Sequence, residues 1–388
     1  GQRAAISEGG IIFIPESRSI IVQPFMFIIV ERQNLLKQTL EQVANASDSD
    51  LKKELKVKFK DEEGIDEGGV RKEFFQLLIG QLFDVNYGMF VHVDEESNKL
   101  GEYDEKKSSE GVVFFNRNCT WRIEEYNLIG TLLGLAVYNG VLLDVQLPLV
   151  VYKKLLGCPV CLNDLDGIDQ ELKRGLQQLL DYNGDDIEEV FCRTFEVEWD
   201  NFGLAEKIEL IPGGSEISVC KENRELYVKR YVSWLLGEGI KEQFEAFYNG
   251  FHRVMRSASL KILRAEELEL LVAGCPEIDF EALRSVTEYD GGYDQDHPTI
   301  KQFWNVLCSF ELNQKKRFMF FVTGCMRSPA GGLSKINFKV QRAGPDTDSL
   351  PTAHTCFNTF LLPEYSSEEK MKERLLVAIS ECEGFGLK

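Results

Sequence analysis

One cysteine near the end of the chain stands in a setting that suits thiol chemistry. Cys356 lies in the segment Leu350-Pro-Thr-Ala-His-Thr-Cys-Phe-Asn358, between polar residues and just before an apolar run. A thiolate is the reactive form of cysteine, and His354, two residues away, could favour that form electrostatically or position a neighbouring group. The same residue type also fills core positions, because a reduced thiol behaves as a small hydrophobe. The residues by themselves leave both roles open.

A cysteine hydrolase is one alternative for this thiol, and it would need further groups. Such an enzyme brings a distant histidine and an orienting Asn or Asp to the cysteine. Besides His354, the chain contains His92, His252 and His297 as candidates. A second alternative is a noncatalytic interaction module that recruits partners through its acidic surface.

The remaining cysteines give no sign of a metal or cofactor site. Cys158 and Cys161 have CxxC spacing, but no second pair of cysteines or histidines stands near them in sequence to complete four zinc ligands. Ten cysteines spread over 388 residues without dense regular spacing are typical of reduced thiols. The glycine-rich stretch 61–69 is acidic, which disfavours phosphate binding. We therefore expect no cofactor and no metal.

Length and composition indicate at least two folding units around this chemistry. A chain of 388 residues exceeds what one hydrophobic core usually serves, about 250 to 300 residues. The composition, 44% hydrophobic and 28% charged, is that of an ordinary globular protein. Gly274-Cys275-Pro276 interrupts a helical pattern and suits a hinge. We expect one unit over 1–273, the hinge at 274–276 and a second unit over 277–388.

Apolar residues at helical spacing predict mostly helices before this hinge. The predicted helical segments are 31–47, the run that ends at Leu82, 126–156, 170–180, 223–236, 241–251 and 265–272. Residues 55–59 alternate as a strand, and alternation within 190–222 predicts a small hairpin. We therefore expect a small subdomain, near 163–250, inserted in the first unit.

The pattern beyond the hinge is mixed. Residues 299–323 have helical spacing, whereas 336–340 and 357–362 are predicted to be strands. A last helix is predicted over 366–381, with Ser366 and Glu369 at the spacing of a capping box. Cys356 is thus expected just before a strand of an α/β unit.

Charge and hydropathy exclude some classes of partner. A net charge of −19 would repel a phosphate backbone, so nucleic acid is not an expected partner. The apolar stretch Ile20–Val30 is about half the length of a spanning helix, and Leu128–Val151 contains polar residues and a proline. We expect a buried strand and a core helix there, and no membrane insertion. A start at Gly1-Gln2 without a signal peptide suggests an internal fragment, and with reduced thiols it favours a cytoplasmic location.

The segment around Cys356 resembles the active-site signature of HECT ubiquitin ligases. The likeness rests on His354-Thr355-Cys356-Phe357-Asn358, followed by Leu361-Leu362-Pro363-Glu364-Tyr365, and it extends across nearly the whole chain. It is closest to the HERC-type and papillomavirus-oncoprotein-associated members. The further motifs that carry it are Asp66-Glu67-Gly68-Gly69-Val70 with Lys72-Glu73-Phe74-Phe75, Gly88-Met89-Phe90, Gly134-Leu135-Ala136, Thr287-Glu288-Tyr289-Asp290-Gly291-Gly292-Tyr293 and Gly331-Gly332-Leu333.

The resemblance implies an α+β fold of two lobes and a transferase function. A mostly helical N-lobe with a small inserted subdomain would be joined by a flexible hinge to an α/β C-lobe that carries Cys356. A ubiquitin-conjugating enzyme would dock on the small subdomain, ubiquitin would move to Cys356 as a thioester, and the amine of a substrate lysine would then attack. The implied partners are ubiquitin, the conjugating enzyme and protein substrates. Exchange of one thioester for another needs mainly a thiolate and proximity.

The resemblance also implies roles for residues around the thiol. His354, Thr355 and Asn358 would form the supporting loop, and Phe385 aligns with an aromatic residue that the family uses during transfer. Attack by a lysine requires loss of a proton, which a carboxylate would assist. The candidate carboxylates are Asp144 across the lobes and Glu381 and Glu383 in the tail, and Arg32 could join Asp144 on the interlobe surface.

Carried over by position, the docking surface for the conjugating enzyme is apolar and aromatic. Leucines at helical spacing are also typical of packing, so this assignment competes with a plain core role. The family commonly has phenylalanine at one of these positions, 227, where this chain has tyrosine. The predicted docking residues are Leu172, Leu176, Val190, Tyr227 and Tyr231.

Overall fold

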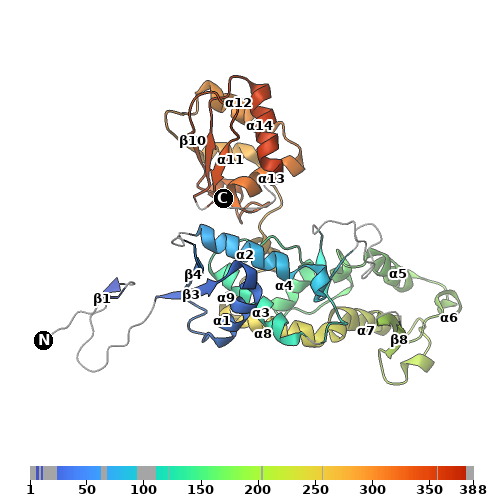
Figure 1. Ribbon diagram of the computed structural model, residues 1–388. Coiled ribbons are helices and arrows are strands. Elements are labelled where there is room, and N and C mark those ends of the chain that lie inside the picture. Colours follow the sequence, from blue (N-terminus) through green and yellow to red (C-terminus); the bar gives the residue numbers. More distant parts are fainter. Residues whose placement is uncertain are drawn as a thin grey trace.

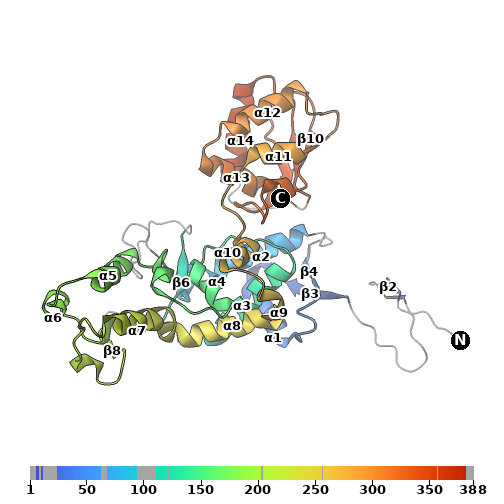
Figure 2. The ribbon, with the colours of Figure 1, turned by 180° about the vertical axis from the view of Figure 1, so that it is seen from behind.

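Two separate hydrophobic cores divide the protein into an N-lobe and a C-lobe. One core runs from Met26 to Val272, and the other from Ile278 to Ile379. In the computed structural model the two bodies are joined by a single connection after α10 (Figures 1 and 2). The predicted bilobed α+β fold is confirmed. The structure describes residues 6–7, 10–11, 24–62, 68–93, 111–120, 122–201, 204–255, 257–355 and 357–381.

The centre of the N-lobe is a close crossing of two helices, α3 (Ile123–Tyr138) and α8 (Lys241–Val254). Two glycines permit this approach. A Cβ atom at Gly130 would lie 1.9 Å from the carbonyl oxygen of Phe247, and one at Gly250 would lie 1.7 Å from that of Asn127. Glycine is needed at both positions because any side chain would push the helices apart.

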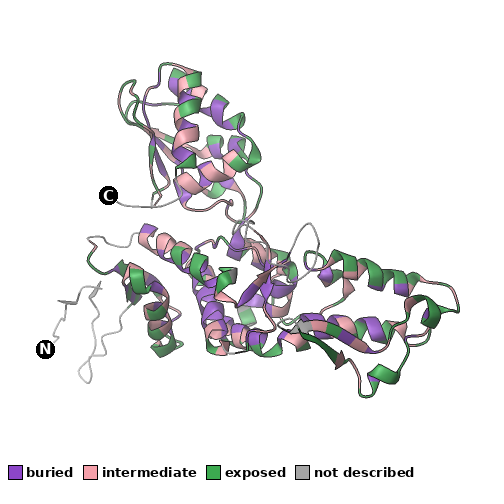
Figure 3. Ribbon diagram, turned by 45° about the vertical axis from the view of Figure 1, so that its right-hand side comes forward, coloured by how far each residue is buried: buried purple, intermediate pink, exposed green. Residues whose placement is uncertain are grey.

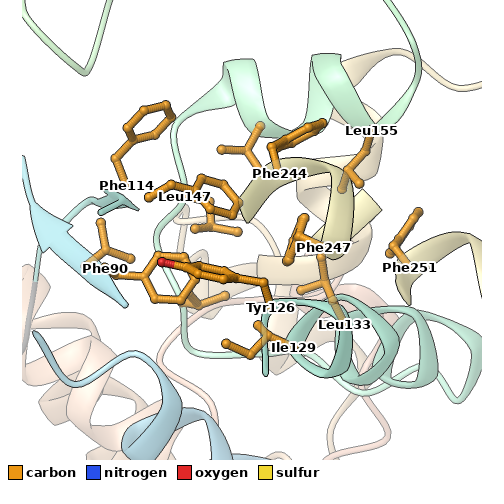
Figure 4. Close-up of a cluster of buried hydrophobic side chains, with 14 of the residues drawn as sticks. Phe90, Phe114, Tyr126, Ile129, Leu133, Leu147, Leu155, Phe244, Phe247 and Phe251 are labelled. Carbon is orange, nitrogen blue, oxygen red and sulfur yellow. The ribbon is translucent and has the colours of Figure 1, made fainter. Parts of the chain in front are cut away.

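Aromatic rings fill the space beside this crossing (Figure 4). Phe115 lies at the centre of the group, with ring centroids 5.3 Å from Phe247, 5.7 Å from Phe244 and 5.7 Å from Tyr126. Edge-to-face and tilted contacts of this kind add specificity to the burial of apolar area. The short strand that supplies Phe115 is thereby fixed against both central helices.

Short strands and further helices make up the rest of the chain before the hinge. Predicted strand 55–59 and the predicted helix ending at Leu82 are both observed. The elements are β1 (Ile6–Ser7), β2 (Gly10–Ile11), parallel β3 (Phe25–Val30) and β4 (Glu54–Phe59), α1 (Leu35–Asn45), α2 (Gly69–Leu82), antiparallel β5 (Phe90–His92) and β6 (Val113–Phe115), α4 (Leu149–Leu155), α9 (Ser257–Leu260) and α10 (Ala265–Ala273), with 3-10 turns η1 (Arg32–Asn34), η2 (Val85–Tyr87) and η5 (Glu238–Ile240).

The prediction of a continuous helical pattern over 126–156 was wrong in its middle. Helix α3 ends at Tyr138, Gly140 has φ 66°, and α4 begins only after Pro148. Residues 141–147 are irregular, and their alternate side chains are buried. An extended chain explains the apolar content of this segment as well as a helix does, because it buries every second residue. No helix in the described part of the chain is long and apolar enough to span a bilayer.

The small subdomain forms one end of the N-lobe, at the right in Figure 1. The predicted hairpin within 190–222 is present. Arg117 of the N-lobe centre anchors the subdomain, since its guanidinium lies 5.6 Å and 4.8 Å from the rings of Trp199 and Trp234. The elements are η3 (Leu162–Leu165), α5 (Gln170–Asp181), α6 (Ile187–Phe191), antiparallel β7 (Glu196–Asn201) and β8 (Leu204–Glu209), η4 (Gly214–Glu216) and α7 (Arg224–Leu236).

The C-lobe wraps helices around a four-stranded sheet of order β11-β12-β10-β9. Strand β10 is parallel to β9 and β12, and β11 is antiparallel to β12. Rings of Phe303 and Phe360 stack with centroids 5.3 Å apart and join a helix to the sheet. The elements are α11 (Phe280–Val286), β9 (Glu288–Asp290), α12 (Pro298–Cys308), α13 (Leu312–Thr323), η6 (Leu333–Lys335), β10 (Lys339–Arg342), β11 (Thr352–His354), β12 (Thr359–Leu362) and α14 (Glu368–Ser380).

Two details of the C-lobe correct the sequence predictions. The helical segment 299–323 consists of two helices, because α12 ends at Cys308 and Glu311 caps a new helix through a capping box with Gln314. The last helix is capped by Ser367, whose hydroxyl accepts from the backbone N–H of Lys370 at 3.2 Å. Ser366 was predicted for this role. With two adjacent serines, spacing alone does not identify the cap.

Candidate functional site

The candidate site begins with the loop between the two antiparallel strands β11 and β12, which we call the thiol loop (residues 354–358). Cys356 itself lies outside the described residues. His354 is exposed, Thr355 is half-buried, and the side chain of Phe357 is 59% exposed. The N–H of Phe357 donates to the carbonyl oxygen of His354 at 3.1 Å. The residues on both sides of position 356 are therefore accessible from solvent, on a tight turn.

Asn358 gives the thiol loop its shape. Its backbone has φ 47°, in the left-handed region that asparagine tolerates better than other residues with a Cβ atom. Its carbonyl oxygen accepts from the N–H of Lys339 at 3.1 Å, which ties the end of the loop to β10. The predicted supporting role of Asn358 is thus compatible with a backbone function.

A lysine of the N-lobe reaches the thiol loop. The Nζ atom of Lys72, on α2, lies 3.4 Å from the carbonyl oxygen of Thr355 and 3.4 Å from Oδ1 of Asn358. These long hydrogen bonds place a positive charge beside the residues that flank position 356. Sequence reasoning quoted the motif containing Lys72 but assigned it no role. Helical spacing does not show which polar residue of α2 contacts the other lobe.

Asp144 was predicted as an interlobe carboxylate. It is an exposed residue of the irregular segment after α3. Burial raises the pKa of the Cys325 thiol to about 11, and Asp144 also raises it, while Arg327 and Lys72 lower it. The charges of Asp144 and Lys72 are therefore close enough to Cys325 of the C-lobe to act on its thiol.

The predicted hinge is held on both sides by backbone hydrogen bonds. The N–H of Leu143 donates to the carbonyl oxygen of Val272 at 2.8 Å on the N-lobe side. On the other side, Cys275 and Ser328 exchange two hydrogen bonds of 2.7 and 2.9 Å. Gly274 lies between them with φ 77°. Gly274 therefore joins the two anchored segments, and its own N–H donates to the carbonyl oxygen of Leu270 at 3.1 Å.

Four further residues were predicted to take part in transfer or to lie on the interlobe surface. Phe385 and Glu383 lie outside the described residues, and Glu381 is an exposed residue at the end of α14. Arg32 forms ion pairs of 2.6 Å with Glu62 and 2.7 Å with Glu73. Both partners belong to the N-lobe, so these contacts give Arg32 a role within that lobe.

The predicted docking residues of the small subdomain are mostly interior. The side chains of Leu176 and Tyr227 are 5% and 2% exposed, and Leu172 and Tyr231 are half-buried. Burial raises the pKa of Tyr227 to about 12, and its ring contacts those of Phe195 and Tyr231. Leu176 and Tyr227 therefore pack the subdomain, and a partner does not reach them in this conformation.

Val190 differs from the other four docking residues. Its side chain, on the short helix α6, is 52% exposed. Figure 3 shows buried residues concentrated at the lobe centre and exposed ones over the outer faces of the small subdomain. Of the predicted set, Val190 is the residue whose side chain is exposed.

The histidines that a cysteine hydrolase would require have other contacts. A ring nitrogen of His252, in α8, lies 3.0 Å from the carbonyl oxygen of Leu155. His297 caps α12 and lies 3.3 Å from the carboxylate of Glu364. His92 is on β5 of the N-lobe. No described contact links these side chains to the thiol loop. The described residues also contain no cluster of three or more His, Cys, Asp and Glu residues suited to a metal ion.

Comparison with known proteins gives one consistent family. Residues 76–388 match the model of the family described as HECT-domain (ubiquitin-transferase). The chain is 41% identical over 377 residues to the probable E3 ubiquitin-protein ligase HECTD2 of Homo sapiens, covering 94% of this chain and 46% of that protein. It is 38% identical over 376 residues to the probable E3 ubiquitin-protein ligase HERC4 of Homo sapiens, covering 97% and 34%.

A fungal protein shows the same likeness. The chain is 36% identical over 376 residues to the probable E3 ubiquitin-protein ligase HUL4 of Eremothecium gossypii, covering 96% of this chain and 44% of that protein. This chain therefore spans less than half the length of each of these relatives. The likeness concerns one part of larger proteins.

Proposed function

The chain belongs to the HECT-domain (ubiquitin-transferase) family, and from this premise we propose that Cys356 accepts ubiquitin as a thioester and passes it to a substrate lysine. The observation that supports the residue assignment is the thiol loop, in which His354 and Phe357 are exposed and Asn358 has a left-handed backbone. The proposed partners are ubiquitin, a ubiquitin-conjugating enzyme and protein substrates. Ten cysteines spread through the chain without dense regular spacing support a cytoplasmic place of action.

The proposed reaction has two steps. In the first, the Cys356 thiolate attacks the carbonyl carbon of the thioester that joins ubiquitin to the conjugating enzyme. A new C–S bond forms, and the thiolate of the conjugating enzyme leaves. In the second, a lysine amine attacks the new thioester, a C–N bond forms, and the Cys356 thiolate leaves. A carboxylate that takes the proton from the lysine ammonium assists this step, and Asp144 is the candidate at the lobe boundary.

Lys72 acts in this scheme as a positioning residue. Its ammonium lies 3.4 Å from the carbonyl oxygen of Thr355, next to position 356. A positive charge there favours a thiolate over a thiol and holds the loop in one arrangement. Because Lys72 belongs to the N-lobe, this support depends on how the lobes are arranged.

Docking and transfer are divided between distant parts of the protein. We assign first contact with the conjugating enzyme to the outer face of the small subdomain, around the exposed Val190. The thiol loop lies in the other lobe, so the C-lobe has to move to meet the donor. We place the pivot at Gly274, between the two anchored segments of the hinge.

The direct test is formation of the ubiquitin adduct. The fragment is incubated with activating enzyme, conjugating enzyme and ubiquitin and is examined on a non-reducing gel. We expect an adduct that thiol reagents remove, no adduct with Cys356→Ala, and a thiol-resistant ester with Cys356→Ser. Cys308→Ala is the matched control, because Cys308 is an exposed cysteine of the same lobe. An adduct that survives in Cys356→Ala, or its absence from the unaltered fragment with several conjugating enzymes, contradicts the proposal.

A further inference from the structure

One lysine of the N-lobe lies beside the thiol loop. The Nζ atom of Lys72 is 3.4 Å from the carbonyl oxygen of Thr355 and 3.4 Å from Oδ1 of Asn358. Figures 1 and 2 both show its helix, α2, on the side of the N-lobe that faces the C-lobe. Thr355 and Asn358 stand on the two sides of position 356, the residue proposed to carry ubiquitin. The structure therefore brings an amine next to that position.

Covalent geometry limits how far this amine can be from an acyl group on residue 356. Consecutive Cα atoms are about 3.8 Å apart, because the peptide unit is rigid. An amine in contact with the carbonyl oxygen of Thr355 is therefore within about one side-chain length of an acyl group on the next residue. The flexible four-carbon stem of a lysine can cover that distance. Attack by Lys72 then requires rotation of its side chain but no movement of the lobes.

Lys339 of β10 provides a comparison within the C-lobe. Its backbone N–H donates to the carbonyl oxygen of Asn358 at 3.1 Å, so this residue stays with the thiol loop in every arrangement of the lobes. Its Nζ atom, however, is 3.8 Å from the carboxylate of Glu288 on β9. Strands β9 and β12 lie on opposite sides of β10, so the ammonium of Lys339 is directed away from β12, the strand that follows the thiol loop. Of these two lysines, Lys72 is the one whose amine is directed at the loop.

A carboxylate that could take a proton from Lys72 lies in the same neighbourhood. Burial raises the pKa of the Cys325 thiol to about 11, Asp144 raises it further, and Lys72 lowers it. The carboxylate and the amine of the N-lobe therefore both act on one sulfur of the C-lobe. A lysine ammonium has to lose a proton before it attacks a carbonyl carbon, and a nearby carboxylate assists this loss.

We propose that Lys72 is a self-modification site, to which ubiquitin passes from the thioester on Cys356 of the same molecule. This inference rests on the proposed function. The ammonium of Lys72 gives a proton to Asp144, and the neutral amine attacks the carbonyl carbon of the thioester. A C–N bond forms, the C–S bond breaks, and the Cys356 thiolate leaves. Attack within one molecule is fast because the two groups are held together and do not have to meet by diffusion.

Modification of Lys72 would limit the activity of the molecule that carries it. Acylation converts the ammonium into a neutral amide, so the positive charge beside Thr355 is lost. The attached ubiquitin also lies on the side of α2 that the C-lobe approaches (Figures 1 and 2). A self-modified molecule is therefore expected to accept further ubiquitin more slowly than an unmodified one.

The first experiment locates the modification and tests whether it occurs within one molecule. The fragment is incubated with activating enzyme, conjugating enzyme and ubiquitin, together with a nitrogen-15-labelled Cys356→Ala fragment. After reduction and digestion with trypsin, mass spectrometry locates the peptides that keep a ubiquitin remnant. We expect the remnant on Lys72 of the unlabelled chain, at least about tenfold more often than on the labelled one, because the donor and the amine share one molecule. Its rate constant should not change when the protein is diluted.

Two variants complete this experiment. Lys72→Arg keeps a positive charge but offers no amine for acylation, so the remnant should disappear without moving to Lys339. Lys339→Arg is the matched control and should keep the remnant on Lys72. A thioester on Cys356 without a remnant on Lys72, equal modification of the labelled chain, or more remnant on Lys339 than on Lys72 overturns the inference alone. Absence of the thioester contradicts the proposed function and the self-modification with it.

The second experiment tests the effect on activity. The unaltered fragment and Lys72→Arg are each incubated with ubiquitin and its enzymes, purified, treated with a thiol reagent and assayed for single-turnover discharge of the charged conjugating enzyme. We expect incubation to slow discharge severalfold in the unaltered chain, and not to slow it in Lys72→Arg relative to that variant's own starting rate. An equal decline in both chains, or no decline in an unaltered chain that carries ubiquitin on Lys72, overturns the self-limiting role.

Discussion

The thiol loop of the C-lobe and the small subdomain of the N-lobe hold their candidate side chains in opposite ways. In the loop, His354 and Phe357 are accessible on a turn that backbone hydrogen bonds maintain. In the subdomain, Leu176 and Tyr227 are almost fully buried, and Val190 is the exposed member of the predicted set. Substitutions in the thiol loop are therefore expected to leave the C-lobe folded. Most substitutions of the docking residues are expected to disturb the packing of the small subdomain first.

The largest expected effect is at Leu176. Leu176→Ala removes a side chain that is 5% exposed, and we expect a loss of about 2–5 kcal/mol of stability in the small subdomain. Hydrogen exchange across α5 and α7, together with thermal unfolding, measures it. His354→Ala, at an exposed loop position, should leave both unchanged. If Leu176→Ala keeps normal hydrogen exchange and thermal unfolding but loses binding of the conjugating enzyme, Leu176 contacts the partner. The contrast between an accessible thiol loop and buried docking residues would then be wrong.

The next effect separates contact from packing within the subdomain. Val190→Asp places a charge on a side chain that is 52% exposed, and we expect about tenfold weaker binding of the conjugating enzyme, roughly 1.4 kcal/mol, with unchanged thermal unfolding. Ile262→Asp is the control, because that side chain is 83% exposed in the N-lobe outside the small subdomain. Equal losses of affinity in the two variants would remove Val190 from the docking surface.

A smaller effect tests the backbone of the thiol loop. At the left-handed Asn358, alanine is expected to cost the C-lobe about 1 kcal/mol, whereas glycine adopts this conformation without strain. Both variants lose the contact with Lys72. A lower thermal midpoint for Asn358→Ala than for Asn358→Gly is therefore expected from the backbone alone. Identical midpoints would show that the turn does not depend on its left-handed residue.

The smallest effect concerns the charge that the N-lobe brings to the loop. Lys72→Met keeps an unbranched chain but removes the ammonium, and we expect transfer to Cys356 to slow by roughly threefold, the size of a weak surface charge interaction. Single-turnover discharge of the charged conjugating enzyme measures the rate. Lys37→Met, at an exposed position of α1, serves as the control. An unchanged rate in Lys72→Met would mean that the loop acts without support from the N-lobe.

Local sequence was sufficient for features that depend on neighbouring residues. The family signature around Cys356 indicated the HECT family, which the family model confirms, and helical spacing located α5, α7 and α8. Gly130 and Gly250 were not singled out. Their role depends on a crossing between helices that the chain separates by the whole small subdomain.

Only the tertiary structure decided which face of each helix or strand packs against another element. Helical spacing names the apolar residues of α5 but not whether Leu176 faces a partner protein or the subdomain's own α7. The same limit hid the contact of Lys72 with the other lobe. Periodicity records how side chains are distributed around one segment. Burial and strand pairing depend on contacts between segments that are far apart in sequence, so the pattern of one segment cannot determine them.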